Sequence, residues 1–184
     1  RLLQRLIDDG ARAVAFDIIF TEDGPDPAAD QALTDAIRES GRVVMAADLS
    51  LTGSLDYGAV NEITPPFEPF LDAADHRWGF ARLHYDQDYV VRQHYHGTDP
   101  DRPSLGWAIA SFLDLPATRA PDAQSTERWS NYYGGPVTIP NISYYQVLYE
   151  NGVPPGFFRD KVVFIGARPM AKSYLARNDE ARSS

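Results

Sequence analysis

The chain has 184 residues, a length typical of one domain, and its 17 basic and 26 acidic side chains give a net charge of −9. Its 43% hydrophobic and 12% aromatic content is enough to build a buried core, which argues against a disordered tail. The acidic balance disfavours binding to a phosphate backbone, so we expect no nucleic-acid partner. Cysteine is absent, which excludes disulfides, thiolate metal sites and a cysteine nucleophile.

The ends of the sequence indicate a segment of a longer protein. The chain starts at Arg1, without an initiator Met, inside an amphipathic pattern, and it ends in the polar residues 181–184. The richest apolar stretch, residues 13–20, is far shorter than the roughly 18 to 20 residues that cross a bilayer. We therefore expect any membrane-spanning part to lie outside this chain.

The first elements predicted are a helix and a buried strand. Leu2, Leu3, Leu6 and Ile7 fall at helical spacing, which predicts a helix over residues 1–9 ended by Gly10. Residues 13–20 are apolar on both faces, as expected of a strand inside a sheet that is covered on both sides.

A second helix and a second strand follow. Asp26 and Pro27 form a helix start, with a capping side chain and proline in the first turn, and Gly41 is placed to end that helix. Residues 43–47 predict another buried strand. Helices and strands that alternate with short connections are typical of parallel α/β units.

The middle of the chain is less regular. Glycine and proline residues over 48–75 predict a loop with one short helix. Residues 79–96 predict a β-hairpin around the turn at 86–88, with Tyr85 paired to Tyr89.

The next stretch predicts a capped helix and a linker. Ser104 can cap a helix that ends before Pro116, and residues 116–128 read as a polar loop. A short strand is predicted over residues 129–133.

The last third returns to regular structure. Ser143 and Gln146 have the spacing of a capping box, and residues 161–166 predict a third strongly buried strand. Together these elements predict an α/β fold. We expect a single compact domain, with a mixed, mostly parallel central sheet flanked by helices and an inserted β-hairpin.

An acidic cluster is the first candidate for chemistry, since none of the common phosphate-binding, serine-hydrolase, dinucleotide or zinc-protease motifs occurs. A carboxylate at Asp17, in the middle of a buried strand, needs a partner or a cleft. With Glu22 and Asp23 it forms a candidate Mg²⁺ or Ca²⁺ site, which favours a metal-assisted hydrolase. The commoner alternative is an Asp at a strand end bonded to backbone amides, with its acidic neighbours solvated or placed at a helix N-terminus.

Three histidines raise a zinc hypothesis. His94 and His96 are two residues apart on one face of the predicted hairpin, near His84. Arg82 and Arg92 share that face and would repel a cation, so a solvated hairpin face is the commoner reading.

An aromatic cluster is the third candidate. It could line a pocket with Asn131 and Ser143 as polar groups, or its rings could simply be packed with their hydroxyls in water. Its members are Trp129, Tyr132, Tyr133, Tyr144, Tyr145 and Tyr149.

Several segments, taken in order, resemble the type-two CHASE domain, a cyclase- and histidine-kinase-associated sensing extracellular domain. The resemblance covers nearly the whole chain, and its motifs are more specific together than singly. They are residues 10–20, 30–36, 43–46, 86–92, 131–134, 143–148 and 158–166.

The sequence departs from the family pattern at three places. Tyr89 stands at a turn position where the family tends to have glycine, and Gln146 stands where aspartate is common. Residues 167–170 do not follow the usual continuation.

The resemblance implies a sensory input domain on the outer, periplasmic or extracellular face of a bacterial membrane. The parent receptor would cross the membrane before Arg1 and after Ser184, with residues 167–184 as a tail that leads to the membrane. Its cytoplasmic output would be an adenylate or guanylate cyclase, a histidine kinase or a Ser/Thr kinase. The fragment itself would be non-catalytic, would need no cofactor and would work as a homodimer.

Our leading hypothesis is a sensor that binds an unknown small molecule or protein near the carboxyl ends of the central strands. The candidate binding residues are Asp17, Phe20, Asn131, Tyr132, Ser143 and Tyr144. We expect the signal to be the relative position of the helix over residues 1–9 and the tail after Gly166. The alternatives are the metal-assisted hydrolase and a structural spacer that dimerises the receptor and binds nothing small.

Overall fold

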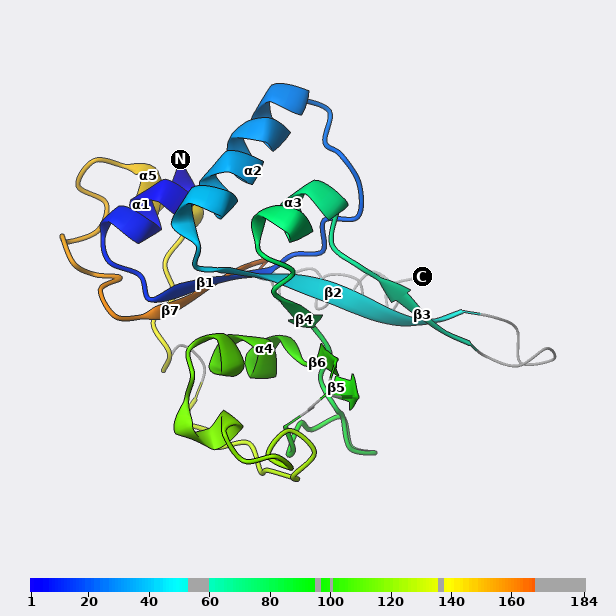
Figure 1. Cartoon of the computed structure of the whole chain (residues 1–184). Coiled ribbons are helices and arrows are strands. Elements are labelled where there is room, and N and C mark those ends of the chain that lie inside the picture. Colours follow the sequence, from blue (N-terminus) through cyan, green and yellow to red (C-terminus); the bar gives the residue numbers. More distant parts are fainter. Residues whose placement is uncertain (53–59, 95–96, 100, 136–137, 168–184) are drawn as a thin grey trace, which may run out of the picture.

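The computed structural model describes residues 1–52, 60–94, 97–99, 101–135 and 138–167, and it is an α/β fold. A central sheet carries α1, α2, α3 and α5 on one face and α4 on the other (Figure 1). The helices are α1 (Leu2–Asp8), α2 (Pro27–Ser40), α3 (Glu68–Ala73), α4 (Leu105–Phe112) and α5 (Tyr144–Leu148), with a 3₁₀ turn η1 (Pro116–Thr118). The strands are β1 (Ala13–Asp17), β2 (Val43–Thr52), β3 (Val60–Thr64), β4 (Trp78–Phe80), β5 (Gly97–Asp99), β6 (Arg102–Pro103) and β7 (Val162–Gly166).

The central sheet has five strands and is mostly parallel. Its order is β3-β2-β1-β7, with β4 paired to the first half of β2. The β1–β2, β1–β7 and β2–β4 pairs are parallel, and only β2–β3 is antiparallel. The predicted fold class, a single α/β domain with a mixed and mostly parallel sheet flanked by helices, is confirmed.

The core lies on both faces of β1 and β2. Val14 and Met45 pack towards α1, α2 and α3, whereas Ala15, Val44 and Ala46 pack against α4. All five side chains are fully buried. Apolar residues at consecutive positions are what a strand covered on both sides requires, as predicted.

The helix starts agree with the sequence signals because each rests on a local hydrogen bond. The Asp26 carboxylate accepts hydrogen bonds from the amides of Ala28 and Ala29, and Gly41 ends α2 in the left-handed conformation. Ser104 caps α4 by accepting from the Trp107 amide at 3.1 Å.

Two strand predictions need correction. The strand predicted over residues 13–20 ends at Asp17, which is exposed rather than buried in mid-strand. The strand predicted over residues 161–166 is present as β7 (Val162–Gly166), but it is an edge strand with Val162 and Phe164 exposed. An apolar strand sequence does not reveal whether the strand lies in the centre of a sheet or at its edge, and therefore how much of it is buried.

The middle of the chain is more ordered than predicted. Within residues 48–75 the short helix is present as α3, but β2 continues to Thr52 and pairs antiparallel with β3. This second half of β2 projects beyond the helical layers (Figure 1).

The hairpin predicted over residues 79–96 is absent from the described part of that range, residues 79–94. Residues 78–80 are β4 of the central sheet, and the described residues after them run irregularly to a turn in which the Asp86 amide donates to the Val90 carbonyl. In place of a strand over 129–133, one isolated bridge joins Gln93 to Trp129.

Candidate functional site

An apolar groove lies where the two ends of the described chain meet. It has a volume of about 740 Å³ and runs between α1, α5, the segment 139–143 and β7. Grooves of this size and apolar character are typical ligand-binding sites. Its lining residues are Leu2, Leu6, Ile139, Pro140, Asn141, Ile142, Ser143, Tyr144, Val147, Phe157, Phe158 and 161–166.

Few polar groups face this groove. Lys161 is the one charged residue in the groove lining. The Lys161 ammonium group donates to the Phe157 carbonyl and lies 5.1 Å from the centre of the Phe157 ring. No other strand in the described part of the chain pairs with the outer edge of β7. Backbone N–H and C=O groups on an open edge can bond to a partner. The groove thus combines an apolar surface with a hydrogen-bonding rim.

The capping box holds one wall of the groove. The Ser143 hydroxyl accepts from the Gln146 amide at 3.4 Å, and the Gln146 side-chain oxygen accepts from the Ser143 amide at 3.2 Å. This reciprocal pair fixes the start of α5, as predicted from the spacing of Ser143 and Gln146. Ser143 and Tyr144 are therefore placed in the groove wall by local backbone geometry.

Asp17 and Phe20 lie at the end of β1 in different surroundings. Asp17 is opposite Gly166 in the β1–β7 register, and a Cβ added to that glycine would lie 3.4 Å from the Asp17 Cβ. Asp17 therefore borders the groove through Gly166. Phe20 is half-buried and packs its ring edge-on against Phe16 and Phe70, so it is a core residue.

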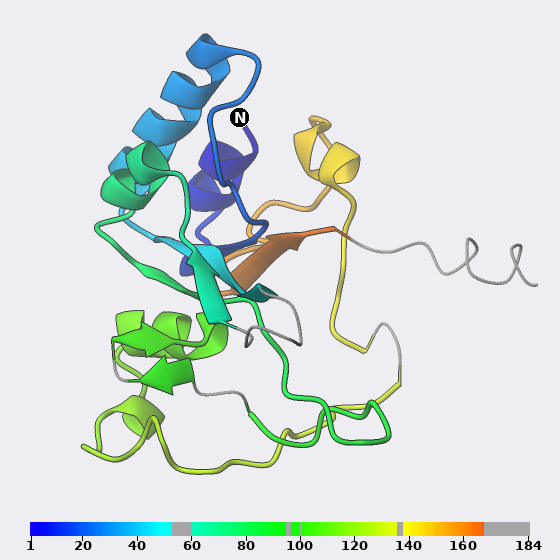
Figure 2. The ribbon, with the colours of Figure 1, turned by 90° about the vertical axis from the view of Figure 1, so that its right-hand side faces the viewer.

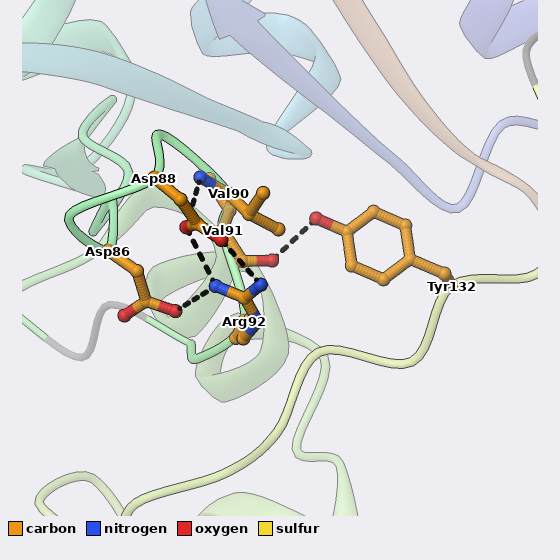
Figure 3. Close-up of polar contacts among 6 residues, drawn as sticks. All are labelled: Asp86, Asp88, Val90, Val91, Arg92 and Tyr132. Carbon is orange, nitrogen blue, oxygen red and sulfur yellow. Dashed lines mark hydrogen bonds and ion pairs between the residues drawn. The ribbon is translucent and has the colours of Figure 1, made fainter.

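Asn131 and Tyr132 lie outside the groove lining, on an exposed segment. The Tyr132 hydroxyl donates to the carbonyl of Val91, which ties this segment to the turn region 86–92 (Figure 3). In Figure 2 this region lies in the half of the molecule opposite the N-terminus. The structure thus divides the six predicted binding residues among three places, of which only Ser143 and Tyr144 line the groove.

The turn at 86–90 is held by a cluster of charges that we call the Arg92 clamp: Asp86, Asp88 and Arg92. The Arg92 guanidinium bonds to Asp86 at 2.7 Å and to both oxygens of Asp88 (Figure 3). The side-chain hydrogen bond from Arg92 lowers the pKa of Asp88 to about 2, and the same contacts raise the pKa of Arg92. Tyr89 lies in the turn between the clamp residues, and its φ of 61° is in the left-handed region that favours glycine.

The described residues contain no cluster of metal-ligating side chains that would support the Mg²⁺, Ca²⁺ or Zn²⁺ hypotheses. Among the described residues, no group of three or more His, Asp or Glu side chains is placed to hold a metal ion. Glu22 and Asp23 are exposed beside the end of β1, and His96 lies outside the described residues. All six residues of the aromatic cluster are exposed, and only Tyr144 lines the groove.

A comparison with models of known protein families shows which family the chain belongs to. The model of the CHASE2 domain matches residues 1–175, nearly the whole chain. The chain belongs to the CHASE2 domain family. Neither the curated proteins nor the solved structures contain a match.

CHASE2 domains are extracellular sensory domains of signalling receptors, so this chain is a sensor module and not itself a catalyst. In the described part of the chain, no helix has the length and apolar character needed to cross a bilayer. The match agrees with the resemblance to the type-two CHASE domain found in the sequence.

Sequence reasoning missed most of the groove. Leu2, Ile139 and Ile165 come from segments far apart in the chain, and no local pattern brings them together. It also missed Asp9, whose carboxylate binds two backbone amides near β7. The only local sequence signal for this role is the position of Asp9, an acidic residue directly before Gly10 at the end of the first helix.

Proposed function

We propose that this CHASE2 domain is the extracytoplasmic input of a transmembrane receptor and that it senses through the groove beside β7. Adenylate cyclase is the first candidate for the cytoplasmic output, and a histidine or Ser/Thr kinase is the second. The observation that supports the site is the groove itself, because its walls come from the first helix and from the last described strand. A ligand there would contact α1 and β7 directly.

Both the position and the chemistry of the groove suit an input site. Binding can change an output only if it favours one arrangement of the receptor over another. The apolar walls would take an apolar part of a stimulus, and Ser143, Tyr144 and Asp17 lie at or beside the groove as polar groups.

The experiment uses the protein as its gene encodes it, expressed in membranes of a bacterial strain that lacks its own adenylate cyclase. Cyclic AMP is measured first, and autophosphorylation is measured if no cyclic AMP forms. Two groove variants are tested: Tyr144→Ala in the groove lining and Asp17→Asn, which borders the groove beside Gly166. They are compared with Tyr145→Ala, an exposed neighbour on α5 that neither lines nor borders the groove. We expect the groove variants to change the output roughly fivefold or more, the lower end of ordinary coupling between sites, and Tyr145→Ala to leave it unchanged.

The outcomes separate the alternatives. Unchanged output in both groove variants would refute the groove as the input site and favour a structural spacer. No cyclase or kinase activity in the encoded protein would refute the proposed output. Asn131→Ala and Tyr132→Phe, on the separate exposed segment, test whether that region contributes to sensing.

We propose further that the receptor works as a homodimer, because cyclases and kinases of this kind act as dimers. Crosslinking in native membranes should trap the protein at twice its monomer mass. A receptor that runs as a monomer over a range of crosslinker lengths would refute this.

A further inference from the structure

Asp9 joins the two ends of the described chain. It lies directly after α1, and its two carboxylate oxygens accept hydrogen bonds from two backbone amides in the segment that leads into β7. The Gly156 amide bonds to one oxygen at 2.5 Å and the Phe158 amide bonds to the other at 2.7 Å. The partners are 147 and 149 residues away in sequence. One side chain therefore connects the first helix to the approach of the last described strand.

The backbone next to Asp9 strengthens this connection. The Gly10 carbonyl accepts from the Asp160 amide at 2.9 Å, and the Arg12 amide donates to the Lys161 carbonyl at 2.8 Å. Gly10 has a φ of 94°, and a Cβ added there would lie 3.4 Å from the Arg159 Cα. The chain after α1 therefore runs against residues 156–161 with little room between them.

Apolar packing acts in the same place. Leu3 and Leu6 of α1 are buried in one cluster with Val153 and Phe158. Packed side chains resist separation but are compatible with sliding, because dispersion contacts have little direction. The hydrogen bonds of Asp9 are directional and charge-assisted, so they fix the end of α1 against residues 156–158, the segment that leads into β7.

The pKa of Asp9 is lowered, first by the hydrogen bond from the Phe158 amide and further by the one from Gly156. Asp9 is therefore ionised at neutral pH and can accept both bonds.

We propose that Asp9 is a latch that fastens α1 to β7, so that the two ends of the domain move as one rigid unit. The inference rests on the proposed function, in which both ends lead to the membrane. It replaces the expectation that the signal is a displacement of the first helix relative to the tail within one chain. With the latch closed, a stimulus changes the output by moving both ends together, as a rotation or translation of the whole domain relative to its partner.

The test measures distances within one subunit of the protein as encoded. This chain contains no cysteine, and any cysteine that the encoded protein carries outside it is first replaced by serine. Gln4→Cys on α1 and Phe164→Cys on β7, both exposed, then give the two spin-label sites. Labelled protein is diluted with unlabelled protein so that only distances within one subunit are seen. We expect one narrow distance with Asp9 intact and a broad distribution in Asp9→Ala.

Asp8→Ala is the matched control. Asp8 is exposed and bonds to Gln4, a contact that the label has already removed. Asp9→Asn is a milder variant that is included in case Asp9→Ala fails to fold. Asparagine keeps the shape of the side chain and one acceptor oxygen, so we expect Asp9→Asn to broaden the distance distribution less than Asp9→Ala does. Hydrogen exchange at the Gly156 and Phe158 amides should accelerate at least roughly tenfold in Asp9→Ala and stay unchanged in Asp8→Ala.

Two results would overturn the latch. One is a distance distribution in Asp9→Ala as narrow as in Asp8→Ala, and the other is unchanged exchange at both amides. Neither measurement depends on cyclase or kinase activity. Failure of the latch is therefore distinct from failure of the proposed function, which is judged by the output alone.

Discussion

The guanidinium of Arg92 makes two side-by-side hydrogen bonds to the carboxylate of Asp88, at 2.8 and 2.7 Å. Asp86 accepts a third bond from the same group. This two-point geometry is the strongest form of an arginine–carboxylate contact, and it closes the turn around Tyr89. The turn is thus held by side chains in a region where the described backbone makes few ladder bonds.

The Arg92 clamp predicts a defined pH dependence. The pKa of Asp88 is lowered from 3.8 to about 2 by its bonds to Arg92. A carboxyl group whose pKa is lower in the folded state stabilises the fold above its unfolded pKa and loses this contribution as pH falls through the folded value. We therefore expect the contribution of Asp88 to be constant from pH 7 down to about 4 and to disappear between about 4 and 2.

The measurement is urea unfolding across that pH range for the wild type and for Asp88→Asn. The difference in unfolding free energy between the two should shrink below pH 4, and added salt should reduce it at neutral pH because the pair is exposed. A difference that stays constant to pH 2 would show that the clamp does not form in solution.

Tyr89 predicts a stabilising substitution. Its side chain is 87% exposed and its φ is 61°, so the residue contributes strain and little burial. Tyr89→Gly and Tyr89→Ala both remove the ring, but only glycine is free of the left-handed strain. We expect the glycine variant to exceed the alanine variant by about 1 kcal/mol in unfolding free energy. Equal midpoints in urea would contradict the left-handed conformation.

The capping box predicts a local weakness at α5. Ser143→Ala removes the hydroxyl that accepts from Gln146, and we expect the unfolding free energy to fall by about 1 kcal/mol. Gln146→Glu keeps the reciprocal acceptor and should preserve stability. Chemical denaturation measures both, and a loss in Gln146→Glu as large as in Ser143→Ala would argue against the box.

Phe158, before β7, and Phe164, within β7, should differ widely in how much their replacement lowers the unfolding free energy. Phe158 is buried, so Phe158→Ala should lower the unfolding free energy by about 3–5 kcal/mol. Phe164 is 58% exposed, so Phe164→Ala should cost less than about 1 kcal/mol. Both are measured in the same denaturant series at low protein concentration. A large cost at Phe164 would mean that this side of β7 is covered in solution.

Features that depend on residues close together in the sequence, such as helix ends, were predicted most accurately. Asp26, Gly41, Ser104 and Ser143 each act within three or four positions of a helix end, so their effects are visible in the sequence. The parallel α/β arrangement also followed, because alternating helices and doubly covered strands leave few other topologies.

Burial is harder to predict because it depends on position in the sheet. Phe16 and Phe164 both occur in apolar strand sequences, yet β1 is central and β7 lies at the edge. Asp17 is exposed because β1 ends there, not because a partner neutralises it within the strand.

The middle of the chain shows a different limit. The turn at 86–88 was predicted from its residues, but its flanks do not pair, since the Arg92 clamp and the Tyr132 hydroxyl hold them instead. The hairpin of β2 and β3 was missed because glycine and proline in this stretch weaken any strand signal. The groove was missed for a third reason, since its walls are assembled from segments far apart in the chain, residues 2–6, 139–147 and 157–166.

The pairing of β1 with β7 has a consequence for biogenesis. The first strand of the domain bonds to a strand about 150 residues later, so the β1 edge stays open until β7 is synthesised. Contacts this distant in sequence form slowly. The β1–β7 edge of the sheet therefore closes only after β7 has emerged, which leaves the domain incompletely folded during most of its synthesis.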